Sequence, residues 1–219
     1  VFSGVNNPPE TYGYIGSKNT IGVLEQMHFI PSVGLLQQID PDIKKIAVIS
    51  EPGGFWDSVT NKMKEEDAAT PDIEIVALDF VQKYSDYQKK MMEYPKIADA
   101  VCLLGIFIFK DENGNNVSFD DVIKWTVENS KLPDFSYWRD RVEKGTFASM
   151  TVSGYEQGLA AGKLAYSILA EGKSPDSFSF KPTVKGEPVV SLARANKLGI
   201  AIQSDVLLAV EAFDTFAWE

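Results

Sequence analysis

Short apolar runs alternate with helical patterns along most of the chain. The strand-like runs lie at residues 1–5, 45–50, 73–80, 99–109, 132–138 and 147–152. Helical patterns follow at about residues 55–69, 85–94, 118–130, 153–172, 192–198 and 204–216. The runs are uniformly apolar rather than alternating, and helices separate them, which is typical of a parallel sheet covered on both faces. The sequence therefore predicts an α/β fold with a doubly wound parallel sheet.

Local signals place several helix starts. Three S-x-x-(E/Q/D) patterns predict capping boxes, at Ser85 with Gln88, Ser118 with Asp121, and Ser153 with Glu156. The pattern weakens over residues 178–189, which contain Pro182 and Pro188 and are interpreted as a polar connector.

Charge and composition exclude several classes of function. The chain has 219 residues with 21 Lys and Arg against 31 Asp and Glu, a formal net charge of −10, which disfavours binding to nucleic acid. A single cysteine, Cys102, and a single histidine, His28, predict no internal disulfide and no metal centre. The apolar run at 99–109 is too short for a membrane helix, which needs about 20 residues. Glycine-rich phosphate loops and G-x-S-x-G elbows are absent, so we expect neither an enzyme nor a cofactor.

Candidate binding residues follow the strand-like runs. Ligands of open parallel sheets bind outside the carboxyl ends of the strands. The residues predicted there are Asn6, Asn7, Ser50, Glu51, Phe55, Phe107, Ser136, Tyr137, Trp138, Ser153 and Tyr155. Aromatic rings combined with small polar groups are typical of a small-molecule site, in which the rings stack on the ligand and Asn7, Ser50 and Ser153 bind its polar end. The open alternative is that the rings only pack internally.

Four segments in order carry a family resemblance. VFSGVNNP, LLQQIDPDIKKIAVIS, VSGYEQGLAAGKLAYSILAEGKSP and VVSLARANKLGIAI together resemble the ABC-transporter substrate-binding proteins of the type I periplasmic-binding-protein fold, in the branch that binds amino acids. The resemblance implies a C-terminal-type lobe at residues 21–152 plus 175–219. Residues 1–20 plus 153–174 are then the remnant of an N-terminal-type lobe. Family members carry about a hundred further residues before the first strand, so this second lobe is expected to be incomplete.

The function implied by the resemblance is ligand binding without catalysis. We expect an extracytoplasmic solute-binding protein of an ABC importer, with a permease as partner, that binds an amino acid or similar small molecule, aromatic ones included, between its lobes. The alternative is an extracellular sensing domain of a bacterial signalling protein such as a histidine kinase. We expect a periplasmic or extracellular location, with a membrane anchor in a missing N-terminal segment left open. Self-association is expected through the strand at Val1–Val5, which would otherwise be an exposed edge.

Overall fold

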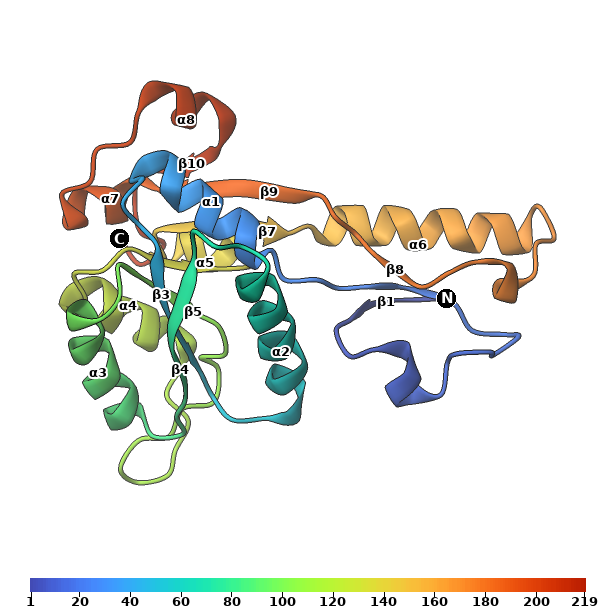
Figure 1. Ribbon diagram of the computed structural model, residues 1–219, viewed down its shortest axis with the longest axis horizontal. Helices are drawn as coiled ribbons and strands as arrows, with labels where there is room; N and C mark the ends of the chain where they lie inside the picture. Colours follow the sequence, from blue (N-terminus) through green and yellow to red (C-terminus); the bar gives the residue numbers. More distant parts are fainter. The chain divides into compact units, whose positions relative to one another are not determined.

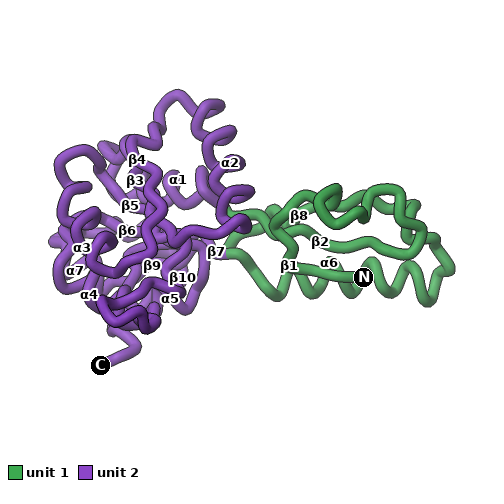
Figure 2. Tube along the Cα trace, turned by 90° about the horizontal axis from the view of Figure 1, so that it is seen from below, with its two compact units in different colours: residues 1–27, 152–186 green, residues 28–151, 187–219 purple.

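The computed structural model describes residues 1–219 and divides into two compact units (Figure 2). Unit 1 comprises Val1–Met27 and Val152–Gly186, and unit 2 comprises His28–Thr151 and Glu187–Glu219. These boundaries differ from the lobes implied by the resemblance, because strand pairing groups residues 21–27 and 175–186 with the N-terminal strand. The assignment of the two lobes of a binding protein stays a prediction.

Unit 2 is built on a seven-stranded, mostly parallel sheet in the order β10-β9-β7-β6-β5-β3-β4 (Figure 1). Its strands are β3 (Lys45–Ser50), β4 (Glu74–Phe80), β5 (Ala100–Leu103), β6 (Asp134–Ser136), β7 (Ala148–Val152), β9 (Gly186–Ser191) and β10 (Glu211–Phe213). The non-consecutive order with helical crossovers confirms the predicted doubly wound α/β fold.

Helices cover both faces of this sheet. They are α1 (Phe29–Ile39), α2 (Gly54–Ala68), α3 (Tyr84–Glu93), α4 (Phe119–Asn129), α5 (Arg139–Glu143), α7 (Leu192–Leu198) and α8 (Ser204–Ala209), with the short 3-10 helix η2 (Tyr94–Lys96). Figure 1 shows α2 on one side of β3–β5, and α3 with α4 on the other. Ala47 and Ile49 of β3 share a buried cluster with Tyr87 and Met91 of α3. Alternate strand residues therefore supply two separate cores, one on each face.

Unit 1 is smaller. Its strands are β1 (Phe2–Val5), β2 (Gly22–Leu24) and β8 (Lys181–Pro182), parallel in the order β1-β2-β8, and α6 (Gly154–Leu169) packs on β1 and β2. Two 3-10 helices, η1 (Pro9–Tyr12) and η3 (Pro175–Ser177), complete it. β1 forms one edge of the sheet, and association through it stays a prediction. None of the helices in either unit is both long enough and apolar enough to cross a membrane.

Two expectations about strands are wrong. The third strand of the large sheet ends at Leu103 rather than near Phe109, because the N–H groups of Phe107 and Ile108 bind the Glu51 carboxylate instead of a neighbouring strand. The expected connector at 178–189 contains the start of β9, which begins at Gly186. Only Val189–Ser191 of this strand pair with β10, so Pro188 precedes the ladder and interrupts no hydrogen bond there.

Helix starts were predicted in part. Ser118 and Ser153 cap α4 and α6, since their hydroxyls accept hydrogen bonds from the backbone N–H of Asp121 and Glu156. Ser85 caps nothing, because α3 begins one residue earlier at Tyr84. The pattern at 204–216 forms α8 and then β10 rather than one helix.

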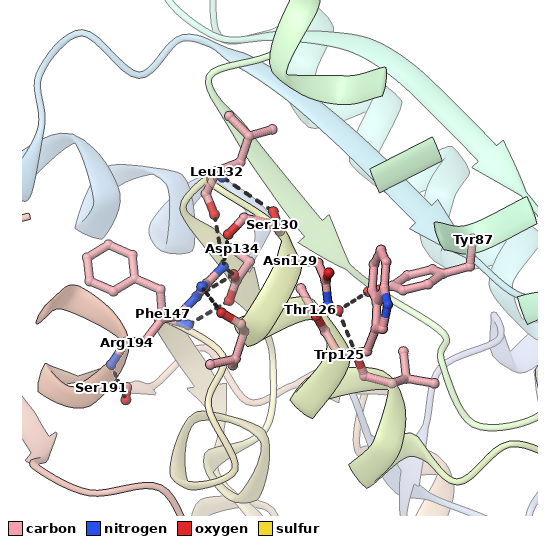
Figure 3. Close-up of polar contacts among 12 residues, drawn as sticks. Tyr87, Trp125, Thr126, Asn129, Ser130, Leu132, Asp134, Phe147, Ser191 and Arg194 are labelled. Atoms are coloured by element: carbon pink, nitrogen blue, oxygen red, sulfur yellow. Dashed lines mark hydrogen bonds and ion pairs between the residues drawn. The ribbon is translucent and has the colours of Figure 1, made fainter. Parts of the chain in front are cut away.

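A buried ion pair fixes the short strand β6. Arg194 of α7 donates to Asp134 Oδ2 from Nη2 and Nε at 2.6 and 3.0 Å, and both side chains are 1% exposed (Figure 3). The same guanidinium donates to the carbonyls of Val127, Ser130 and Leu132, and Asp134 Oδ1 accepts from the Phe147 N–H. The pair therefore joins α7, β6, the end of α4 and the start of β7.

We predict that Arg194→Met lowers the free energy of unfolding by about 3–5 kcal/mol, because it leaves the Asp134 carboxylate buried without its cation. Urea unfolding followed by circular dichroism measures the loss. The matched control is Arg139→Met, which removes an exposed arginine paired with Glu211 and should cost at most about 1 kcal/mol. Equal losses in the two variants would contradict the assignment.

Candidate ligand-binding site

Glu51 shapes the loop that follows β5. Its Oε2 accepts the backbone N–H groups of Phe107 and Ile108 at 2.7 and 2.8 Å, and its Oε1 accepts from Trp56 Nε1 at 3.3 Å. The Glu51 side chain is buried although Glu51 directly follows strand β3 at the carboxyl edge of the sheet. One carboxylate thus replaces the strand hydrogen bonds that residues 107 and 108 would otherwise need.

Four aromatic side chains gather at the carboxyl ends of β3, β5 and β6, and we call Phe55, Trp56, Phe107 and Trp138 the aromatic wall. The ring centroids of Trp56 lie 4.4 Å from Phe55 and 6.5 Å from both Phe107 and Trp138. Phe107 and Trp138 are 6.1 Å apart with their planes at 71°. Phe55 and Phe107 are 37% and 41% exposed, while Trp56 is buried behind them. These rings form an apolar surface whose positions are fixed by mutual contact.

Gly105 makes room for Trp56. A Cβ at this position would lie 2.5 Å from the Trp56 ring and 2.6 Å from Ser50 Oγ, so a larger residue would displace the ring. Ser50 Oγ also accepts the Gly105 N–H at 3.2 Å. Gly105, two residues after the end of β5, therefore leaves the space that the Trp56 ring occupies at the centre of the aromatic wall.

Arg141 of α5 lies behind the wall and is 1% exposed. Its Nη1 donates to the carbonyls of Leu103 and Leu104 and to Ser136 Oγ, at 2.8–2.9 Å. Burial lowers the pKa of the Arg141 guanidinium to about 10, so the group remains protonated at neutral pH.

The structure brings together part of the predicted residues of unit 2. Phe55, Phe107 and Trp138 lie together in the aromatic wall, with Glu51 beneath them. Ser50, Ser136 and Tyr137 are almost completely buried, and their polar atoms contact Gly105, the Leu103 carbonyl and Cys102 respectively. These three support the wall from inside the protein.

The predicted residues of unit 1 have different environments. Asn6 Nδ2 donates to Glu25 Oε1 at 3.3 Å, and Asn7 Nδ2 donates to the Tyr12 hydroxyl at 3.0 Å. Ser153 is buried as the cap of α6, whereas Tyr155 is 72% exposed.

A polar cluster in unit 1 joins Asn6, Glu25 and Gln157. Glu25 Oε2 accepts from Gln157 Nε2 at 3.2 Å, and no cationic side chain forms an ion pair with Glu25. The Asn6 Oδ1 atom is buried without a hydrogen-bond partner. The cluster thus combines a carboxylate and a free amide oxygen, which are acceptors suited to a donor such as an ammonium group.

Sequence reasoning missed Trp56, Arg141, Glu25 and Gln157. Trp56 stands at helical spacing with Val59 and Met63, a pattern that by itself indicates a helix rather than a binding role, and nothing in the local sequence marks the other three as parts of a site. The positions of all four depend on contacts between segments distant in the chain, which for Trp56 are those with Phe107 and Trp138. No group of three or more His, Cys, Asp or Glu side chains lies close enough to hold a metal ion.

An aromatic surface at the carboxyl edge of a doubly wound sheet is typical of α/β proteins that bind small molecules, and comparison identifies the family. A model of the ABC transporter substrate binding protein family matches residues 14–215. The chain belongs to this family, and its fold is that of a periplasmic binding protein. No curated protein matched the sequence.

Three solved structures share this fold. A conserved domain protein from Vibrio cholerae has a TM-score of 0.68 at 21% sequence identity. The match covers 98% of this chain and 71% of the Vibrio cholerae chain. The ABC domain from Streptococcus pneumonia in complex with L-Trp has a TM-score of 0.67 at 18% identity, covering 95% and 71%. CD0873 of Clostridium difficile, a substrate binding protein with adhesive properties in its ligand-free, open structure, has a TM-score of 0.69 at 17% identity, covering 95% and 69%.

We predict that Glu51→Gln destabilises the protein by about 1–3 kcal/mol, because an amide group replaces an oxygen that accepts buried N–H donors. The near-ultraviolet circular dichroism of the tryptophans should weaken in parallel, since Trp56 loses its fixed partner. Glu143→Gln is the control, since Glu143 forms only a partly exposed pair with Arg139. Identical urea midpoints and spectra for the two variants would refute the role of Glu51.

We also predict that Cys102 is unreactive in the folded protein. Burial raises the pKa of its thiol to about 12. At pH 8 only about one thiol in ten thousand is then ionised, and the thiolate is the reactive form. An aromatic disulfide reagent should therefore label the chain only after denaturation. Rapid stoichiometric labelling of the native protein would show that this part of the sheet opens.

Proposed function

We propose that the chain is the solute-binding component of an ABC importer, acting outside the cytoplasmic membrane with the importer's permease as its partner. The proposed ligand is an amino acid, or a similar small carboxylate, that carries an aromatic or apolar side chain. Its side chain is proposed to stack on the aromatic wall of unit 2.

The aromatic wall is the observation that carries this proposal. Four rings converge at the carboxyl edge of the parallel sheet, where ligands of this fold class bind. Phe55 and Phe107 keep more than a third of their surface exposed although both contact Trp56. Partly exposed rings that are held in place by buried groups suit an apolar or aromatic ligand, and each aromatic pair adds about 0.5–1.5 kcal/mol beyond burial.

The comparison with the Streptococcus pneumonia domain supports an aromatic ligand. That domain was solved in complex with L-Trp, and it shares the fold and most of the length of this chain. Its ligand is extended to this chain as part of the proposal only. Taken by itself, unit 1 holds acceptors at Asn6 and Glu25 that are chemically suited to an ammonium group.

A thermal-shift screen with L-tryptophan, L-tyrosine, L-phenylalanine and, for contrast, L-aspartate tests the ligand class. The melting temperature should rise with at least one aromatic amino acid and not with aspartate, because a ligand of the folded state stabilises it by RT ln(1 + [L]/Kd). A shift with aspartate alone, or with none of the four, would reject the proposed class.

We predict that Trp138→Ala weakens binding of the best aromatic ligand about tenfold, because it removes one stacking surface and the contact with Trp56. Isothermal titration calorimetry measures the affinity. Trp218→Ala is the matched control, since Trp218 stacks only on Phe216 near the end of the chain. Unchanged affinity in Trp138→Ala would remove Trp138 from the site.

A further inference from the structure

The guanidinium of Arg141 lies in the corner formed by two rings of the aromatic wall. Its Cζ is 4.4 Å from the centroid of Phe107 and 4.3 Å from that of Trp138. Both distances are well within the range of a cation–π contact. The charge therefore contacts the rings on which the ligand is proposed to stack, from the inside of the protein.

No carboxylate pairs with this cation. Arg194, the other buried arginine, binds Asp134 directly, whereas no salt bridge forms at Arg141. The Arg141 Nη2 atom is buried without any hydrogen-bond partner. The acids that act on it electrostatically are Asp140 and Glu51, and the two oxygens of Glu51 already accept three N–H donors. A buried positive charge thus remains without a carboxylate partner directly behind the wall.

The charge of Arg141 affects any charged ligand group that stacks on the outer faces of the two rings. Their inner faces already contact a cation, so a second cation on the outer faces gains less from the ring quadrupole and is repelled by the first. A ligand group stacked outside would lie about 8 Å from the guanidinium, where the interaction of two unit charges near a protein surface corresponds to about tenfold or more in affinity. An anionic ligand group therefore binds more tightly by this factor in affinity, and a cationic group binds more weakly by the same factor.

We propose that Arg141 is a specificity-determining residue, which makes the wall of Phe107 and Trp138 favour ligands with negative charge at the stacked end and reject cationic ones of the same shape. This inference rests on the proposed function, because it concerns the ligand held by the same wall. It narrows the ligand class from aromatic and apolar side chains to those that are neutral or acidic at their tip.

Three probes with one amino-acid end and different tips test the proposal. They are L-phenylalanine, 4-carboxy-L-phenylalanine and 4-aminomethyl-L-phenylalanine, whose tips are neutral, anionic and cationic at pH 7. Calorimetry on the full chain gives the affinity ratio of the anionic to the cationic probe. The ratio should favour the anion in the wild type and fall about tenfold or more in Arg141→Met, which keeps the aliphatic stem but removes the charge.

Two variants separate charge from structure. Arg141→Lys retains a cation and should keep most of the wild-type ratio, even if both affinities fall. Arg139→Met removes an exposed arginine two residues away and should leave the ratio unchanged. A loss of affinity for all three probes by the same factor in Arg141→Met would show a purely structural role and overturn the inference.

If Arg141→Met does not fold, the affinities of the wild-type protein for the three probes test the inference. If it binds the cationic probe as tightly as the neutral and anionic ones, the inference is wrong while the proposed function stands. If it binds none of the three probes, and L-tryptophan and L-tyrosine also fail to bind, the proposed function is wrong and the inference falls with it.

Discussion

The arrangement of the large sheet depends on how two buried arginines hold a strand of only three residues. β6 runs from Asp134 to Ser136, too short to be fixed by its ladder alone. Arg194 binds its first residue, Asp134, and Arg141 donates to the hydroxyl of its last residue, Ser136. Each guanidinium also donates hydrogen bonds to backbone carbonyls of neighbouring segments. Its planar set of N–H donors is suited to several acceptors at once. β6 is therefore positioned at both ends by side chains from helices that come later in the chain.

The two buried arginines differ in whether their guanidinium groups have a full set of partners. Arg194 is matched by Asp134 and by three carbonyls, so burying its charge leaves no unpaired group on the cation. Arg141 is matched by two rings, two carbonyls and the Ser136 hydroxyl but by no carboxylate, and one of its nitrogens has no acceptor. Buried polar groups without partners cost free energy, so each one in a native structure calls for an explanation. The unmatched arginine lies behind the aromatic wall, and the matched one lies at the opposite end of the same strand.

Local sequence predicted the sheet well because its strands carry their own signal. The β-branched and apolar runs at β3, β4 and β7 mark strands without reference to any partner. Phe107 and Ile108 read as a continuation of β5, yet they leave it because the Glu51 carboxylate, 56 and 57 residues away in sequence, takes their N–H groups. Similarly, Pro188 suggested a connector, and only the pairing of β9 shows that the proline precedes the residues that pair with β10. Such errors in predicting strand ends arise where a residue distant in sequence forms the hydrogen bonds of the backbone N–H groups.

The same limit applies to the candidate site. Exposed aromatic residues after strands can be found in sequence, because the carboxyl edge of a parallel sheet is a general binding position. The contacts that hold them cannot, since Gly105 and Arg141 act on rings contributed by other segments, and the bonds from the predicted Glu51 to residues 107 and 108 form only in the folded chain. Because buried contacts hold the exposed rings in place, their fixed positions also affect ligand affinity. Ordering a flexible side chain on binding costs about 0.5–1.5 kcal/mol, and rings that are already fixed by buried contacts do not incur that cost. A ligand that stacks on the wall therefore keeps more of its contact energy as affinity, and the buried charges that hold the rings become part of what selects the ligand.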